Sequence, residues 1–197
     1  MSSLGRIALS LSLVASGLAW GTVSLAQSAA DTDPTQAPLA EREVFGFLPY
    51  WELSRAASID YDVLTTLAWF GVEAGRDGQL VREDADGEPT PGWAGWTSDA
   101  FAAVRERARA AGVRVVLTVE RFAWTPAGKR TTKRLLRDPE ARRTLAGEIV
   151  EAVTDADAGG VNLDFEPLPR SVRGEFVRLV REVRRALDAE DPSLQLT

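Results

Sequence analysis

The sequence contains no cysteine and no histidine among its 197 residues. Their absence excludes disulfides, thiol nucleophiles, Ser-His-Asp triads and histidine-ligated metal sites. Acid–base chemistry must therefore come from Asp, Glu, Lys or Tyr, and we expect neither a metal nor a cofactor. Positive charge is also in deficit, since 23 Lys and Arg face 29 Asp and Glu and give a net charge of −6. This balance argues against nucleic acid as the main partner, because phosphate binding needs clustered cations.

A long apolar run occurs only at the N-terminus. Arg6 is the sole charge ahead of the Ala, Ser and Leu-rich run Ile7–Ala26, and small residues offer cleavage after Ala26 or Ala30. Residues 1–30 therefore predict a secretory signal peptide; the run is about 20 residues, enough to span a bilayer, so an uncleaved membrane anchor is the alternative. Both predict a secreted or cell-wall-associated protein, with membrane contact only if the segment stays uncleaved. Residues 31–42 are predicted to be a flexible linker.

Apolar strands and amphipathic helices alternate over residues 43–197. Buried strands are predicted at 44–51, 65–72, 113–119, 159–166 and 194–197, and helices begin near Ser98, Asp138 and Ser171, each of which is a candidate cap. A repeated strand–helix order predicts an α/β fold with a parallel sheet and right-handed crossovers. A doubly wound nucleotide-binding sheet would need a glycine-rich turn after an early strand, and none follows the first three. The polar stretch 73–97 is predicted to be a long loop.

The stretch from Gly159 to Pro167 is the most informative in the chain. Apolar Val161, Leu163 and Phe165 alternate with Asn162, Asp164 and Glu166, as in a strand with one polar face. Alternate residues lie about 6.6 Å apart along a strand, so the two carboxyl groups should be neighbours. Such a pair raises one pKa and keeps a carboxylic acid protonated near neutral pH. The alternative is an antiparallel strand with a solvated outer face.

Aromatic residues at strand ends are candidates either for core packing or for contact with a ligand. Core packing is the favoured interpretation for Trp69 and Phe70. Tyr50, Trp51 and Trp124 are predicted substrate contacts, and the roles of Trp93 and Trp96 stay open between lining a cleft and holding the loop. Glu120 and Arg121 either add polar contacts or form a salt-bridged rim. For the basic run of residues 129–137, a solvated helix face is favoured over contact with an anionic polymer.

The run Gly160-Val161-Asn162-Leu163-Asp164-Phe165-Glu166 resembles the fourth-strand signature of glycoside hydrolase family 18, the chitinase family. Residues 45–51 resemble the family's first strand, which ends in a Pro-Tyr-Trp-like cluster. The resemblance implies a (β/α)8 TIM-type barrel, of which this chain would hold about four βα units and the start of a fifth strand. Gly159 and Asn162 replace two aspartates of the signature, and Asn162 is typical of the branch associated with bacterial cell-wall and spore peptidoglycan.

By position, the resemblance makes Glu166 the general acid and Asp164 the group that holds the substrate's 2-acetamido group, whose carbonyl oxygen is the nucleophile. It implies a secreted glycosidase that cleaves β-linked N-acetylglucosamine polymers, chitin or peptidoglycan, with retention of configuration. Asn162, Tyr50, Trp51, Trp124 and Glu120 would contact the substrate. A non-hydrolytic, lectin-like barrel is the alternative. Since a complete barrel needs about 250 residues, an inactive fragment or truncated product is a further possibility.

Overall fold

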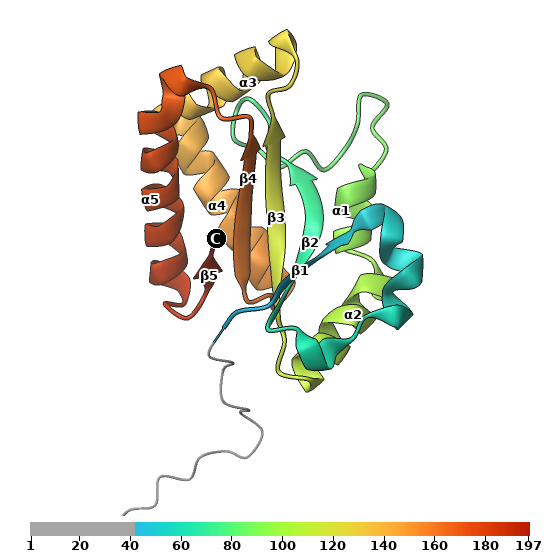
Figure 1. Ribbon diagram of the computed structural model, residues 1–197. Coiled ribbons are helices and arrows are strands. Elements are labelled where there is room, and N and C mark those ends of the chain that lie inside the picture. Colours follow the sequence, from blue (N-terminus) through green and yellow to red (C-terminus); the bar gives the residue numbers. More distant parts are fainter. Residues whose placement is uncertain (1–41) are drawn as a thin grey trace, which may run out of the picture. The chain divides into compact units, whose positions relative to one another are not determined.

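The computed structural model describes residues 42–197 (Figure 1). The predicted signal peptide or anchor, and the linker up to residue 41, lie outside these described residues. Within residues 42–197, no helix is both long enough and apolar enough to cross a membrane.

The framework of the described chain is one sheet of five parallel strands in the order β1-β2-β3-β4-β5. Each new strand is added at the same edge of the sheet, as in a (β/α) barrel and unlike a doubly wound sheet. The predicted parallel α/β architecture is therefore confirmed. The strands are β1 (Phe45–Pro49), β2 (Thr66–Glu73), β3 (Arg114–Phe122), β4 (Gly160–Glu166) and β5 (Gln195–Leu196).

Helices lie between successive strands, with α4 packed on β3 and β4 and α5 packed on α4 (Figure 1). Figure 1 shows α3 across the end of the sheet toward which the strands point. The α-helices are α1 (Pro91–Trp96), α2 (Asp99–Ala110), α3 (Pro126–Arg137), α4 (Pro139–Asp155) and α5 (Arg173–Glu190), and the 3-10 helices are η1 (Tyr50–Ser58), η2 (Tyr61–Val63) and η3 (Arg170–Val172). The predicted caps Ser98 and Asp138 accept backbone N–H groups at the starts of α2 and α4.

The core lies on the face of the sheet that these helices cover. Strand residues Trp69, Leu117 and Val161 are fully buried there, with helix residues Phe101 and Leu145. The core interpretation is therefore correct for Trp69, whose ring lies 4.3 Å from that of Phe101, centroid to centroid. Its indole N–H is also satisfied, because Nε1 donates to the Gly92 carbonyl oxygen at 3.0 Å. The core interpretation is wrong for Phe70, which is only half-buried.

Three other local predictions were wrong. The first strand ends at Pro49, so Tyr50 and Trp51 begin η1, and Phe47 is 54% exposed although the whole run was predicted to be buried. The loop predicted at 73–97 contains α1. The helix predicted to start at Ser171 starts at Arg173, without a side-chain cap, and follows the 3-10 turn η3, in which Val172 is buried.

The second face of the sheet, which the α-helices do not cover, carries polar and aromatic side chains. Near the N-terminal ends of the strands, Glu43 accepts hydrogen bonds from Thr66 Oγ1 at 2.7 Å and from Gln195 Nε2 at 2.6 Å. These bonds join the start of β1 to β2 and to β5, so the sheet curves as a barrel wall does. Gly160 has φ of 143°, and a Cβ there would lie 2.2 Å from the Gln195 carbonyl oxygen, so only glycine fits where β4 meets β5.

Candidate active site

Strand β4 separates its residues onto two faces, as the alternating pattern predicted. Phe165 is buried on the helix side, with its ring 5.3 Å from that of Phe176 in α5. Asp164 is half-buried on the opposite face, and Glu166 is exposed at the C-terminal end of the strand. The backbone hydrogen bonds between β3 and β4 extend to Glu166, since the Ala123 N–H donates to the Glu166 carbonyl oxygen at 2.6 Å. The strand thus fixes the backbone of both carboxylates.

Asp164 and Glu166 form an interacting carboxyl pair. Burial raises the pKa of the Asp164 carboxyl above its usual range. The negative charge of Glu166 and a hydrogen bond between the two carboxyl groups raise this pKa further. Ionisation of Asp164 is therefore opposed by its neighbour, as expected for carboxyl groups that share a site.

Glu120 is a third carboxyl beside this pair. It lies directly opposite Asp164 in the β3–β4 register. Burial raises the pKa of Glu120 to about 7, with the negative charges of Glu73 and Asp164 adding to the rise and Arg121 opposing it. Its Oε2 is buried and has no hydrogen-bond partner among the described residues. Gly71 makes room for it, because a Cβ at that position would lie 2.5 Å from Oε2.

Arg121 forms a salt bridge at the end of β3, as in the salt-bridged rim that was one of the two predicted roles for Glu120 and Arg121. Its guanidinium pairs with the Glu73 carboxylate, and Nη1 donates to the Ala74 carbonyl oxygen at 3.1 Å. Glu120 makes no such pair in the described structure. The sequence did not single out Glu73; it becomes visible only when the register places it opposite Glu120.

Asn162, a predicted substrate contact, uses its side-chain amide within the protein. Its Nδ2 donates to Thr118 Oγ1 on β3 at 3.3 Å, and its Oδ1 accepts from Thr197 Oγ1 at 3.1 Å. The amide therefore ties β4 to the strands on either side, one layer below Asp164. This geometry indicates support for the carboxyl pair.

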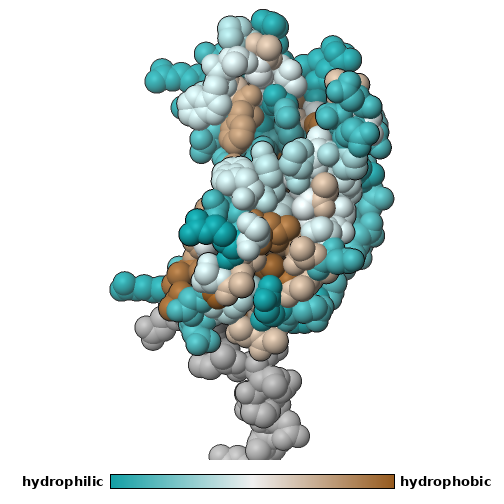
Figure 2. Space-filling model, turned by 90° about the vertical axis from the view of Figure 1, so that its right-hand side faces the viewer, coloured by the Kyte–Doolittle hydropathy of each residue, from teal (hydrophilic) through white to brown (hydrophobic). Residues whose placement is uncertain are grey.

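Aromatic side chains surround the same end of the sheet. Trp51, Trp124 and Tyr50, the predicted sugar contacts, are 58%, 65% and 37% exposed. The Trp51 ring lies 6.1 Å from that of Phe70, which lies 6.3 Å from that of Phe122 on β3. An aromatic row thus crosses the strand ends. Figure 2 shows the α2 side of the molecule, where the surface is hollowed between its upper and lower parts and apolar colour gathers in the lower half.

Two other aromatics belong to the core. Trp96 is 1% exposed, with its ring 5.4 Å from that of Phe101, and Trp93 packs against the core with Arg82 stacked 4.9 Å from its ring centroid. The open question about these tryptophans is settled in favour of holding the 73–97 segment in place.

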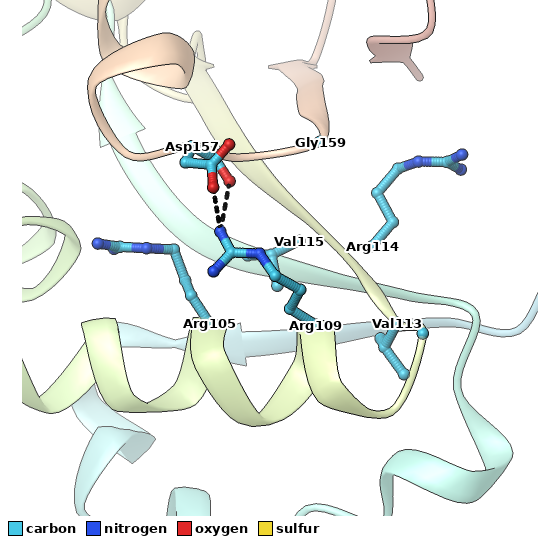
Figure 3. Close-up of a pocket in the computed structure, with 8 residues that line it drawn as sticks. Arg105, Arg109, Val113, Arg114, Val115, Asp157 and Gly159 are labelled. Atoms are coloured by element: carbon cyan, nitrogen blue, oxygen red, sulfur yellow. Dashed lines mark hydrogen bonds and ion pairs between the residues drawn. The ribbon is translucent and has the colours of Figure 1, made fainter. Parts of the chain in front are cut away.

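The opposite end of the sheet has a different character. A cavity of about 290 Å³ lies there, lined by Arg105, Arg109, Arg114 and Asp157 among others (Figure 3). Arg109 is turned toward Asp157 and is also paired with Glu106, so its charge is neutralised (Figure 3). Within residues 42–197 there is no group of three or more acidic residues arranged to hold a metal ion.

No family model matches this sequence, and no curated protein matches it at a significant level. Solved structures do match. A chitinase from Bacteroides thetaiotaomicron aligns with a TM-score of 0.61 and 19% identity over 79% of this chain. The spore cortex-lytic enzyme SleL from Bacillus cereus gives 0.58 and 20% over 79%, and a glycoside hydrolase family 18 chitinase from Cycas revoluta, in complex with (GlcNAc)4, gives 0.59 and 21% over 77%.

The described chain has the fold of the matching part of these structures. The resemblance seen in the sequence is thereby supported at the level of architecture. The chain spans only part of each neighbour, namely 45% of the Bacteroides chitinase, 34% of SleL and 44% of the Cycas chitinase. This partial span agrees with the five strands of the described sheet, against the eight of a complete barrel.

Proposed function

We propose that this chain is the N-terminal part of a glycosidase that hydrolyses β-linked N-acetylglucosamine polymers. The observation that carries the proposal is the placement of Asp164 and Glu166 on one face of β4, with Glu166 exposed at the C-terminal end of the strand. In this fold the C-terminal strand ends carry the catalytic residues. Three neighbours are chitinases or a cortex-lytic enzyme by their names, which supports the same substrate class.

In the proposed reaction, the exposed Glu166 donates its proton to the glycosidic oxygen. The bond from that oxygen to the anomeric carbon breaks, and the acetamido carbonyl oxygen of the same sugar forms a new bond to this carbon. The Asp164 carboxylate accepts a hydrogen bond from the N–H of the acetamido group and so orients this group. The carboxylate also stabilises the positive charge that develops on the acetamido group. Water then attacks the anomeric carbon, the bond from this carbon to the acetamido oxygen breaks, and the water gives its proton to the Glu166 carboxylate, so configuration is retained.

Removal of the N-acetyl groups from the substrate tests this proposal. The full-length protein should cleave N-acetylglucosamine oligomers but not the matched deacetylated oligomers, because the latter carry no acetamido oxygen to act as nucleophile. Products of both are measured by chromatography, and the anomer first released by NMR. Equal cleavage of the two oligomers, or inversion at the anomeric carbon, would show that the substrate-assisted mechanism is wrong.

A non-hydrolytic glycan-binding barrel is the second candidate, and one observation favours it. Tyr50, Trp51 and Trp124 expose ring surface around the strand ends, which suffices for sugar stacking without any proton transfer. If the full-length protein binds N-acetylglucosamine oligomers and leaves them uncut over the whole pH range, this second function replaces the first.

We also propose that the protein acts outside the cytoplasm. The support is the N-terminal sequence alone, in which Arg6 precedes the apolar run Ile7–Ala26 and small residues follow. Mass spectrometry of the N-terminus of the protein from its native host tests this, with cleavage after Ala26 or Ala30 expected for a signal peptide. An intact N-terminus in a membrane fraction would indicate the anchor, and an intact N-terminus in the cytosol would contradict both.

A further inference from the structure

Helix α3 concentrates positive charge in a way that no other described element does. Five of its twelve residues are cationic and none is acidic, and both lysines of the whole chain lie on it. These five residues, here called the α3 basic face, are Lys129, Arg130, Lys133, Arg134 and Arg137. In a chain with a net charge of −6, such a concentration is not an average property of the surface.

The α3 basic face is not neutralised within residues 42–197. Arginines on the other helices form ion pairs, as Arg109 does with Glu106, Arg143 with Glu140 and Arg184 with Asp188. None of the ion pairs of the described chain includes a residue of α3. The next acid along the chain, Asp138, is already used as the cap of α4.

The arrangement is unfavourable for the helix by itself. Lys129 and Lys133, Arg130 and Arg134, and Lys133 and Arg137 are like charges at i and i+4, which repel one another on a helix surface. The helix dipole favours cations only in the last turn, so Lys129 and Arg130 in the first half gain nothing from it. A ligand of opposite charge would remove this repulsion.

Packing fixes this helix close to the candidate active site. Gly128 touches the end of β3, since a Cβ there would lie 2.4 Å from the Phe122 carbonyl oxygen. Leu135 and Leu136 are buried, which turns Arg130 and Arg134 outward, where both are exposed. Only Ala123, Trp124 and Thr125 separate α3 from β3, and Ala123 is hydrogen-bonded to Glu166. The helix is about 18 Å long, and it begins two residues after the exposed Trp124, at the same end of the strands as Glu166.

We propose that the α3 basic face binds acidic groups carried by the same glycan polymer that binds beside Glu166. The preferred substrate would then be a glycan with carboxylates on peptide substituents, as in peptidoglycan, and not a neutral polymer. This inference rests on the proposed function for the cleft, but the surface itself has its own readout, which is binding dependent on salt and on substrate charge.

The experiment compares binding of the full-length protein carrying Glu166→Gln, which prevents turnover, to three insoluble polymers. These are chitin, peptidoglycan freed of phosphate polymers, and the same peptidoglycan with its carboxylates amidated. The variant Arg130→Gln/Arg134→Gln should bind untreated peptidoglycan about three- to tenfold more weakly at low ionic strength, because each exposed ion contact is individually weak. Its binding to chitin should be unchanged, which also shows that it is folded.

The matched control is Arg42→Gln/Arg107→Gln, which removes two exposed arginines away from α3 and should bind all three polymers as the parent does. Amidation of the peptidoglycan, or salt that shortens the Debye length to a few ångströms, should reduce parent binding to the level of the α3 variant. If amidation changes nothing, or the control loses as much as the α3 variant, the proposal is overturned.

Other polyanions give distinct outcomes. If the α3 variant loses binding only to peptidoglycan that retains its phosphate polymers, to anionic vesicles or to DNA, the partner is a phosphate-bearing one and the proposal is wrong. If binding to peptidoglycan depends on charge but the protein with intact Glu166 hydrolyses no polymer, the proposal for the α3 basic face holds and the proposed hydrolysis is wrong. If the protein with intact Glu166 hydrolyses chitin, amidated peptidoglycan and untreated peptidoglycan equally well, the proposed hydrolysis holds and the proposal for the α3 basic face is wrong.

Discussion

The two ends of the parallel sheet treat charge in opposite ways. At the N-terminal ends of the strands, hydrogen bonds from Thr66 and Gln195 lower the pKa of the Glu43 carboxyl. Arg109 nearby is paired with two acids. Glu43 and Arg109 thus each have a partner for the charged form there, as expected for groups that contribute to the fold.

At the C-terminal ends, neighbouring carboxyls oppose one another's ionisation. Burial and like charge raise the pKa values of Glu120 and Asp164, and Glu120 Oε2 lacks a partner among the described residues. Such an arrangement costs folding free energy, and perturbed carboxyls in a concave site are a recognised sign of function. The same strands thus carry a stabilised end and a strained end, and the following substitutions test this difference.

The largest effect is expected for Glu166→Gln at the C-terminal end. Glutamine keeps the size of the side chain but cannot transfer a proton, so the rate of hydrolysis by the full-length protein should fall about 10²- to 10⁴-fold. Binding of N-acetylglucosamine oligomers, measured by calorimetry, should be nearly unchanged. The same substitution at the other end, Glu106→Gln, is the control and should leave the rate intact. Full activity of the Glu166→Gln variant would show that Glu166 is not the general acid.

Asp164→Asn should also slow hydrolysis, by about 10²- to 10³-fold, because the developing positive charge on the acetamido group loses its carboxylate. Both groups act on one step, so the double variant Asp164→Asn/Glu166→Gln should be little slower than the slower single variant. Steady-state rates of the three variants form the test. Multiplicative losses would mean that the two carboxyls act independently.

Glu120→Gln should change how stability depends on pH. The folded-state pKa is about 7 against 4.5 for an unperturbed Glu, so the folded protein holds a proton here that the unfolded chain has lost. Its stability therefore falls as pH rises from about 4.5 to 7, and the loss is complete above pH 7. After allowance for partial exposure and screening, the loss is about 1–2 kcal/mol.

Denaturant unfolding of the full-length protein at pH 5 and pH 8 measures this difference. Glu120→Gln should be less sensitive to pH than the parent by that amount, whereas the exposed Glu88→Gln should behave as the parent does. An unchanged difference between the two pH values in Glu120→Gln would show that Glu120 titrates normally.

The strands and the β4 carboxyl pair were predictable because each depends on a local pattern. The helix α1 was not, since its segment is rich in glycine and proline. Two of those glycines are required by contacts distant in sequence: a Cβ on Gly92 would lie 2.0 Å from the Gly71 carbonyl oxygen, and one on Gly95 would lie 2.3 Å from the Trp69 ring.

The role of Glu120 was only partly predictable for a similar reason. The sequence placed it at a strand end and suggested a substrate contact, but its place opposite Asp164 and beside Glu73 follows from strand register. Register depends on packing over the whole sheet. The start of α5 was missed because Ser171 has good capping chemistry, whereas in the structure Ser171 lies within η3 and α5 has no side-chain cap.

The smallest effect is expected for Arg109→Gln at the N-terminal end. Its pairs with Glu106 and Asp157 are solvent-exposed, with about half of the arginine side chain accessible (48%), so their loss should cost at most about 1 kcal/mol of unfolding free energy. The rate of hydrolysis should not change, because Arg109 lies at the opposite end of the strands from Glu166. Added salt should lower the unfolding free energy of the parent toward that of the variant, because screening weakens exposed ion pairs. Unfolding curves at low and high salt, with hydrolysis rates for both proteins, measure these effects. A clear loss of rate in Arg109→Gln, without a loss of stability, would mean that the N-terminal end also serves function and that the contrast between the two ends is mistaken.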